Sequence, residues 1–254
     1  MQIIELLWPA FVLAIVLVFI HSIFGLEIIR RGVIFTDLAV GQIASIGMAL
    51  SITFLDGAYQ NELTFGFALL AAVIITWATK NIPKIEAFIG LLYAFGISAI
   101  MLILAKSSQG VELFSKLSAA DILFTSQEEL LHSIIIYGFV AFVMFVIYPK
   151  FKGIKKEFLF FAMLALTVTS SVQSAGVLVV FALLIAPSYV GVFSKKPFLS
   201  ATLFGSIGIL VALIASYNFD LPTGYTIIFT TVSSSLLYIV TKEVLMKMSL
   251  KSRT

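Results

Sequence analysis

The sequence contains no cysteine, and only 11% of its 254 residues are charged. The absence of cysteine excludes disulfide bonds, thiolate metal sites and cysteine nucleophiles. The low charge excludes an ordinary soluble domain, which carries charged residues at about a quarter of its positions. The sequence motifs GxSxG, HExxH and GxxxxGK[ST] are also absent. We therefore expect no enzyme activity from this chain, and any ATP that it depends on must bind to another chain.

Apolar residues make up 61% of the sequence, and the mean hydropathy is +1.13. An apolar helix of about 20 residues crosses the hydrocarbon core of a bilayer, which is roughly 30 Å thick. Nearly the whole length can therefore consist of membrane spans, so the sequence predicts an all-α bundle of eight or nine spans in one transmembrane domain, residues 1–254. The apolar segments cover residues 7–26, 33–55, 63–79, 87–105, 130–148, 157–172, 176–193, 198–216 and 221–241.

The basic residues are concentrated in alternate loops. Of the 16 lysines and arginines, 14 fall on one side of the predicted bundle, and only Lys106 and Lys116 fall on the other. Because short cytoplasmic loops are enriched in basic residues, this pattern predicts an outside N-terminus and a cytoplasmic C-terminus. The net charge of +3 is explained by orientation in lipid, and no nucleic-acid partner is expected.

The second apolar segment carries a carboxylate, Asp37, and an amide, Gln42. A carboxylate inside a span costs roughly 2.5 to 3.5 kcal/mol by insertion scales, and such residues usually mark an ion or substrate path. At about 100° per residue, Asp37 and Gln42 fall within one sector of the helix, roughly 140° wide. The opposite side would face lipid or core. An alternative is a structural role, in which Asp37 pairs with a basic group such as Arg30 or Arg31 and Gln42 bonds a backbone.

Several other polar positions and segments have ordinary structural interpretations. The segment TSSVQSAG, 169–176, is either an outside turn or a break in a helix at membrane depth. Asp220, in DLPTG, is expected to cap the start of the last helix. Glu86 and His132 lie at segment ends, where exposure is the ordinary outcome. The long external segment 106–129 is expected to form a partial helix against the outer face.

Four segments together resemble the integral permease subunit of ABC importers for zinc, manganese and iron. They occur in the order of that family and spread over most of the chain. Gly176 and Pro187 belong to the third segment, and Asp220, Pro222 and Gly224 form the fourth. The segments are RRGVIFTDLAVGQIASIGMAL (30–50), EAFIGLLYAFGISAIMLIL (86–104), GVLVVFALLIAPS (176–188) and DLPTG (220–224).

The resemblance implies a permease in a bacterial or archaeal type of cell membrane. Two copies would form a path for the metal, with ATP hydrolysed on cassette subunits and with a metal-binding protein docking outside. No stably bound cofactor is implied, because the metal is the transported substrate. Asp37 matches the family's path aspartate, and Gln42 or Gly41 stands where the family often has a histidine. An amide is a poorer zinc ligand than imidazole, so zinc coordination at that point is disfavoured.

The cytoplasmic segment KFKGIKKEF, 150–158, is the best candidate for contact with an ATPase, through Lys152, Gly153 and Ile154. Its lysines would also serve as an orientation signal without any contact. Two other functions remain open on the residues alone. One is a proton-coupled secondary transporter in which Asp37 carries the proton. The other is a structural membrane protein in which Asp37 holds helices together.

Overall fold

The computed structural model describes residues 2–107, 112, 114–115, 122 and 125–251. Within these residues the regular elements are helices, which confirms the all-α prediction. The last turns of the helix that begins at Gln127 change to a π-helical turn and then a 3-10 turn that ends at Lys150. The helices are α1 (Gln2–Arg31), α2 (Thr36–Phe54), α3 (Gln60–Asn81), α4 (Ile85–Leu104), α6 (Gln127–Phe142), α7 (Gly153–Ala175), α8 (Val177–Val192), α9 (Pro197–Phe219) and α10 (Thr223–Lys251).

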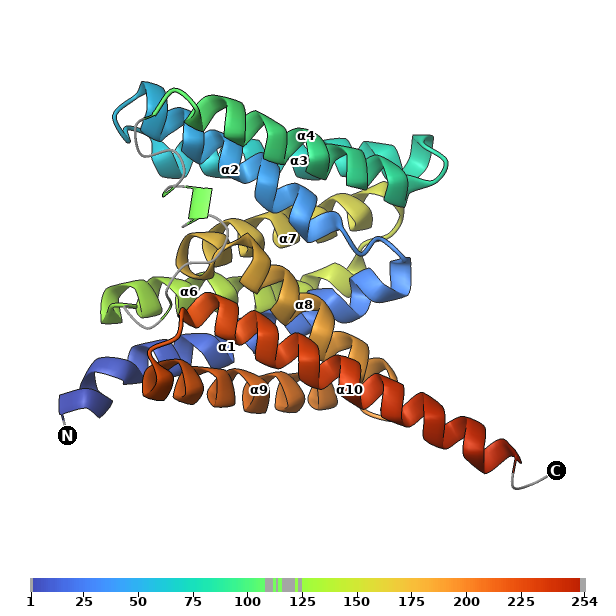
Figure 1. Cartoon of the computed structure of the whole chain (residues 1–254). Helices are drawn as coiled ribbons and strands as arrows, with labels where there is room; N and C mark the ends of the chain where they lie inside the picture. The colour runs from blue at the N-terminus through green and yellow to red at the C-terminus, as the bar shows by residue number, and fades with distance from the viewer. Residues whose placement is uncertain (1, 108–111, 113, 116–121, 123–124, 252–254) are drawn as a thin grey trace.

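The helices are long enough to cross a membrane. Among the described residues, eight helices have the length and apolar composition of a span, and α8 is a shorter apolar helix of 16 residues. This agrees with the predicted eight or nine spans. The two termini lie at opposite ends of the bundle (Figure 1), as expected if α8 crosses the membrane together with the eight longer helices. Which end faces the cytoplasm stays a prediction.

Two helices, α2 and α8, form the centre of the bundle. Helix α2 packs against α3, α4, α7 and α8, and α8 packs against α1, α9 and α10. Figure 1 shows α2, α3 and α4 on one side and α1, α9 and α10 on the other. Every residue of α2 from Thr36 to Ala49 is buried. The face of α2 opposite Asp37 therefore contacts protein core and not lipid.

The polar segment 169–176 belongs to a helix over nearly all its length. Helix α7 continues to Ala175, and α8 begins at Val177. The chain reverses at Gly176 alone, whose φ of 86° and ψ of 156° lie in a region that favours glycine. The polar side chains are accommodated because several bond the helix backbone. Ser171 Oγ, for example, donates to the Thr167 carbonyl oxygen at 2.7 Å.

The DLPTG segment differs from the prediction. Asp220 ends α9 in a left-handed conformation, with φ 51°, and does not cap α10. Helix α10 begins at Thr223, because Pro222 lacks an N–H group and its carbonyl oxygen accepts from Thr226 N at 3.0 Å. Ser216 takes part in the turn, since its hydroxyl lies 2.8 Å from the Thr223 hydroxyl. Gly224, in the first turn of α10, is buried.

Pro187 lies inside α8 and forms part of its contact with α9. Gly205 of α9 faces it so closely that a Cβ there would lie 2.9 Å from Pro187 Cγ. This glycine therefore permits the approach of the two helices. The predicted partial helix in 106–129 falls mostly outside the described residues; Ile122, in that segment, is buried.

Candidate functional site

The turn between α1 and α2 is built by its sequence. Gly32 adopts φ 68°, which glycine tolerates, and follows the last residue of α1. Gly32 N donates to the Ile29 carbonyl at 3.2 Å, and Val33 N donates to the Ile28 carbonyl at 3.3 Å. This pair of bonds is the Schellman motif that ends many helices. Only four residues therefore lie between the end of α1 and the start of α2, and Asp37 falls in the first turn of α2.

Asp37 is buried at this helix start. The residue is 1% exposed, and neither carboxylate oxygen has a hydrogen-bond partner of normal geometry among the described residues. The donors that act on it from nearby are the backbone N–H groups of Asp37 and Leu38 at the helix start. The first turn of a helix favours negative charge because its N–H groups carry partial positive charge, worth roughly 0.3 to 1 kcal/mol. That is less than the roughly 2.5 to 3.5 kcal/mol cost of a carboxylate in a span. The helix end therefore offsets only part of the cost of burying Asp37.

The nearby arginines do not pair with Asp37, which removes the ion pair that a structural role would supply. Arg30 bonds Glu27 with an N–O separation of 2.5 Å. Arg31 bonds Glu27 at 2.9 Å and also pairs with Glu157 of α7. Tyr148 adds a hydrogen bond, accepting from Arg31 Nη2 at 2.8 Å. The alternative in which Asp37 pairs with Arg30 or Arg31 is therefore not the arrangement in the structure.

A second carboxylate contacts the start of α2. Glu86, in the first turn of α4, accepts a hydrogen bond from Phe35 N at 3.2 Å through Oε1, while its Oε2 is buried without a partner among the described residues. The prediction of an exposed segment end missed this contact. The link between residues 35 and 86 depends on the packing of α4 against α2, which sequence spacing does not reveal.

Gln42 lies farther along α2, about 7.5 Å from Asp37 along the helix axis. It is 6% exposed and faces α4, where a Cβ on Gly96 would lie 2.7 Å from Gln42 Cβ. The two predicted path residues thus lie on one buried helix but are not brought to one point. In the described part of the chain, no group of three or more His, Asp or Glu side chains is placed to hold a metal ion.

His21 is buried and makes a structural contact within α1. It is 0% exposed in α1, and its Nδ1 lies 2.7 Å from the Leu17 carbonyl oxygen. Nothing in this contact brings His21 to Asp37.

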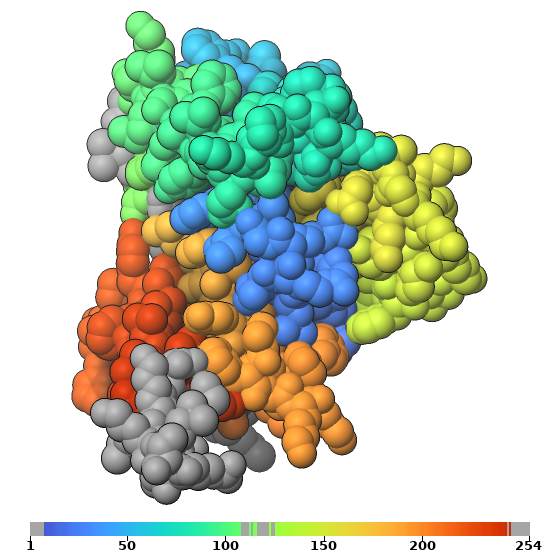
Figure 2. All heavy atoms as spheres, turned by 90° about the vertical axis from the view of Figure 1, so that its right-hand side faces the viewer, coloured from blue at the N-terminus to red at the C-terminus, as the bar shows by residue number. Residues whose placement is uncertain are grey.

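The predicted coupling residues lie on the exposed start of α7. Lys152, Gly153 and Ile154 are all exposed, and Gly153 has φ 59°. Figure 2 looks onto this end of the bundle, where the blue α1–α2 segment lies between the teal α3–α4 segment and the yellow-green start of α7. The pair between Arg31 and Glu157 joins the α1–α2 turn to α7 directly. A contact at residues 152–154 would therefore act close to the start of α2.

This arrangement can be set beside known proteins. A model of the ABC 3 transport family matches residues 3–242. The chain belongs to the ABC 3 transport family. It is thus a multi-pass membrane protein and a transport component, which confirms the family resemblance seen in the sequence.

Individual relatives are similar over most of their length. The manganese transport system membrane protein MntC of Listeria innocua is 26% identical over 240 residues, which cover 86% of this chain and 84% of the relative. The manganese import system permease protein ScaB of Streptococcus gordonii is 26% identical over 254 residues, covering 91% and 88%. The solved structure of PsaBC from Streptococcus pneumoniae in complex with Fab matches with a TM-score of 0.73 at 22% identity, covering 92% of this chain and 90% of that one. This last likeness supports the fold.

Proposed function

We propose that this chain is the permease subunit of an ABC importer that moves divalent metal ions into the cytoplasm, with ATP hydrolysed on a separate chain. The family and the manganese transport relatives support this class of substrate. Manganese is the first candidate, and iron and zinc are the others. Family membership also favours this function over a proton-coupled secondary transporter.

The observation that carries the proposal is the buried, unpartnered carboxylate of Asp37. Carboxylate oxygens are suitable ligands for hard divalent ions such as Mn²⁺. A site with many ligands would bind the ion too tightly for transport, because transport requires that the ion be released. A lone carboxylate on a buried helix binds weakly enough to pass an ion on. The free oxygen of Glu86 supplies a second negative group at the same helix start, and Gln42 supplies an amide deeper along α2.

The assembly follows from the same proposal. Two copies of the chain would enclose the path, and a metal-binding protein would deliver the ion from outside. The cassette subunit would contact residues 152–154 at the cytoplasmic end. This orientation rests on the 14 basic residues gathered on one side of the bundle. The absence of cysteine makes it easy to check, because Lys195→Cys should react with an impermeant thiol reagent only from the cytoplasm and Asn218→Cys only from outside. Reversed labelling would contradict the orientation.

The function is tested by metal uptake in cells. Deletion of this gene from an otherwise intact operon should reduce uptake of one of manganese, iron or zinc at submicromolar supply, and a plasmid copy should restore it. Uptake of all three metals should be measured separately, because the substrate identity is read from the metal whose uptake falls. Unchanged uptake of all three would contradict the proposal.

The ATPase contact is tested separately. A double substitution, Gly153→Asp with Ile154→Asp, should release the cassette subunit during purification or prevent transport-stimulated ATP hydrolysis. The matched control is Lys195→Glu with Lys196→Glu, which also places two carboxylates on an exposed loop at this end of the bundle. Retention of the cassette subunit by the first variant would refute the contact.

A further inference from the structure

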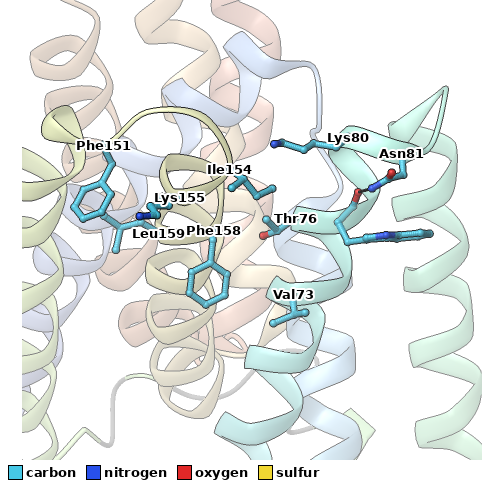
Figure 3. Close-up of a pocket in the computed structure, with 10 residues that line it drawn as sticks. Val73, Thr76, Lys80, Asn81, Phe151, Ile154, Lys155, Phe158 and Leu159 are labelled. Atoms are coloured by element: carbon cyan, nitrogen blue, oxygen red, sulfur yellow. Dashed lines mark hydrogen bonds between the residues drawn. The ribbon is translucent and has the colours of Figure 1, made fainter.

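A lateral groove lies between α3 and α7 near the end of the bundle assigned to the cytoplasm. The cavity has a volume of about 640 Å³ and includes no acidic side chain in its lining. Figure 3 shows Ile154 and Phe158 of α7 extending toward α3, with Val73 and Thr76 opposite them. Val73 and Phe158 are about half exposed, so these apolar side chains form an open surface.

Two lysines belong to this groove. Lys80, near the end of α3, directs its amine toward α7, and Lys155 lies beside Phe151 and Leu159 (Figure 3). Neither lysine forms an ion pair among the described residues. Arg30 and Arg31, at the end of α1, differ from these lysines because both arginines are paired with glutamates. The groove thus combines an apolar wall with two uncompensated positive charges.

The walls of the groove are helices with the length and composition of membrane spans, and Val73, Trp77 and Phe158 are exposed on it, so we place its open side against lipid. Along α3, Val73 lies about two turns deeper in the membrane than Lys80. Along α7, Phe158 lies about one turn deeper than Lys155. Trp77 lies between Val73 and Lys80 on α3 and is 56% exposed, and tryptophan is enriched at membrane interfaces. This order of charge, aromatic ring and apolar surface matches the order of phosphate, glycerol and acyl chain in a phospholipid.

We propose that the α3–α7 groove binds one anionic phospholipid, with its phosphate held by Lys80, with Lys155 adding positive charge at the α7 edge, and with an acyl chain lying against Val73, Trp77 and Phe158. Basic pockets between membrane helices on the cytoplasmic side are suited to anionic lipid headgroups. Because Ile154 lines the groove, the bound lipid would contact the start of α7. The site does not depend on which substrate the chain transports.

Trp77 offers a direct reporter, because the chain contains only two tryptophans. In the full-length chain carrying Trp8→Phe, Trp77 is the remaining tryptophan. The chain is placed in phosphatidylcholine vesicles, and its fluorescence is quenched by either phosphatidylglycerol or phosphatidylcholine with brominated acyl chains. Two lysines near the surface, at about 1 kcal/mol each, should favour the anionic lipid by up to about thirtyfold in apparent affinity.

Three variants separate a specific site from general lipid contact. Lys80→Gln with Lys155→Gln should bring the preference for phosphatidylglycerol close to one, and Lys80→Arg with Lys155→Arg should retain it. Lys195→Gln with Lys196→Gln removes the same charge from an exposed loop and should leave it unchanged. Equal quenching by the two lipids in the Trp8→Phe chain would overturn the proposal. An equal loss of the preference for phosphatidylglycerol in the Lys195 and Lys196 variant would also overturn it. So would a result in which added cassette subunit prevents both lipids from quenching Trp77.

Discussion

Two charged regions lie side by side where α1 passes into α2, and they are built in opposite ways. In the first, Arg31 bonds Glu27, Glu157 and Tyr148, and its guanidinium carbon lies 4.2 Å from the centre of the Phe160 ring. In the second, Asp37 is buried without a partner in the described part of the chain. Only the residues 32–35 separate the two helices.

The first region has charges that compensate one another and stabilise the fold, whereas the second has a carboxylate that is available to bind an ion. The side chains of Arg31 and Glu27 are 18% and 16% exposed, so their charges are partly desolvated and compensate one another. The carboxylate of Asp37 gains only the field of a helix terminus. A substitution in the first region should therefore change stability, and a substitution in the second should change transport.

The largest effect on stability is expected from Arg31→Met. Removal of the guanidinium leaves Glu157 without its cation and deprives Tyr148 of its donor. Breaking a partly buried ion pair should cost about 2–3 kcal/mol, less than the full cost at a dry site because Glu157 is partly exposed. Thermal unfolding of the purified chain in detergent should show a Tm lower by several degrees. A Tm within about 1 °C of the parent would mean that this region does not hold α1 to α7.

An intermediate effect, on transport, is expected from Glu86→Gln. The amide oxygen can still accept from Phe35 N, so the helix start and the Tm should be retained. The lost charge should raise the KM for metal uptake by about three- to tenfold, as expected for roughly 1 kcal/mol of electrostatic attraction. Initial uptake rates measured against metal concentration report this directly. Glu62→Gln, at the exposed start of α3, is the matched control, and an equal effect there would assign the change to general surface charge.

The smallest effect is expected from Arg30→Gln. Its side chain is 72% exposed, and exposed ion pairs contribute about 0–1 kcal/mol. Tm and uptake should both stay close to those of the parent. A loss of stability as large as that of Arg31→Met would show that the two arginines act as one unit and would remove the contrast between them.

Much of the fold could be predicted because lipid imposes simple rules on sequence. Apolar length located the spans, and the resemblance in four segments identified the family. The roles of Gly176 and Asp220 at the ends of helices could be determined only from the structure. A helix that continues through Ser170, Ser171 and Gln173 is not evident from polarity, because those side chains are accommodated by the helix backbone and by polar neighbours. Asp220 looked like a helix cap because the following proline marks a helix start, but the turn places it at the end of α9.

The candidate site was only half predictable, for a physical reason. Asp37 is conspicuous in an apolar segment, so its cost alone draws attention to it. Its isolation could not be predicted fully, because Arg31 pairs with Glu157 on a distant part of the chain. Arg30 pairs with Glu27, which is only three residues away. The contact of Glu86 with the start of α2 likewise joins residues that are 51 positions apart.

The most direct test of the central claim is the initial rate of manganese uptake by proteoliposomes that contain Asp37→Asn, the cassette subunit and the metal-binding protein. The substitution keeps the size of the side chain and removes its charge, so Tm and co-purification of the cassette subunit should be unchanged. Uptake should fall by at least about a hundredfold, as expected when roughly 3 kcal/mol of ion stabilisation is lost. The same result is expected with iron or zinc if either metal is the substrate. Uptake at the parental rate in this folded, assembled variant would contradict a path through Asp37.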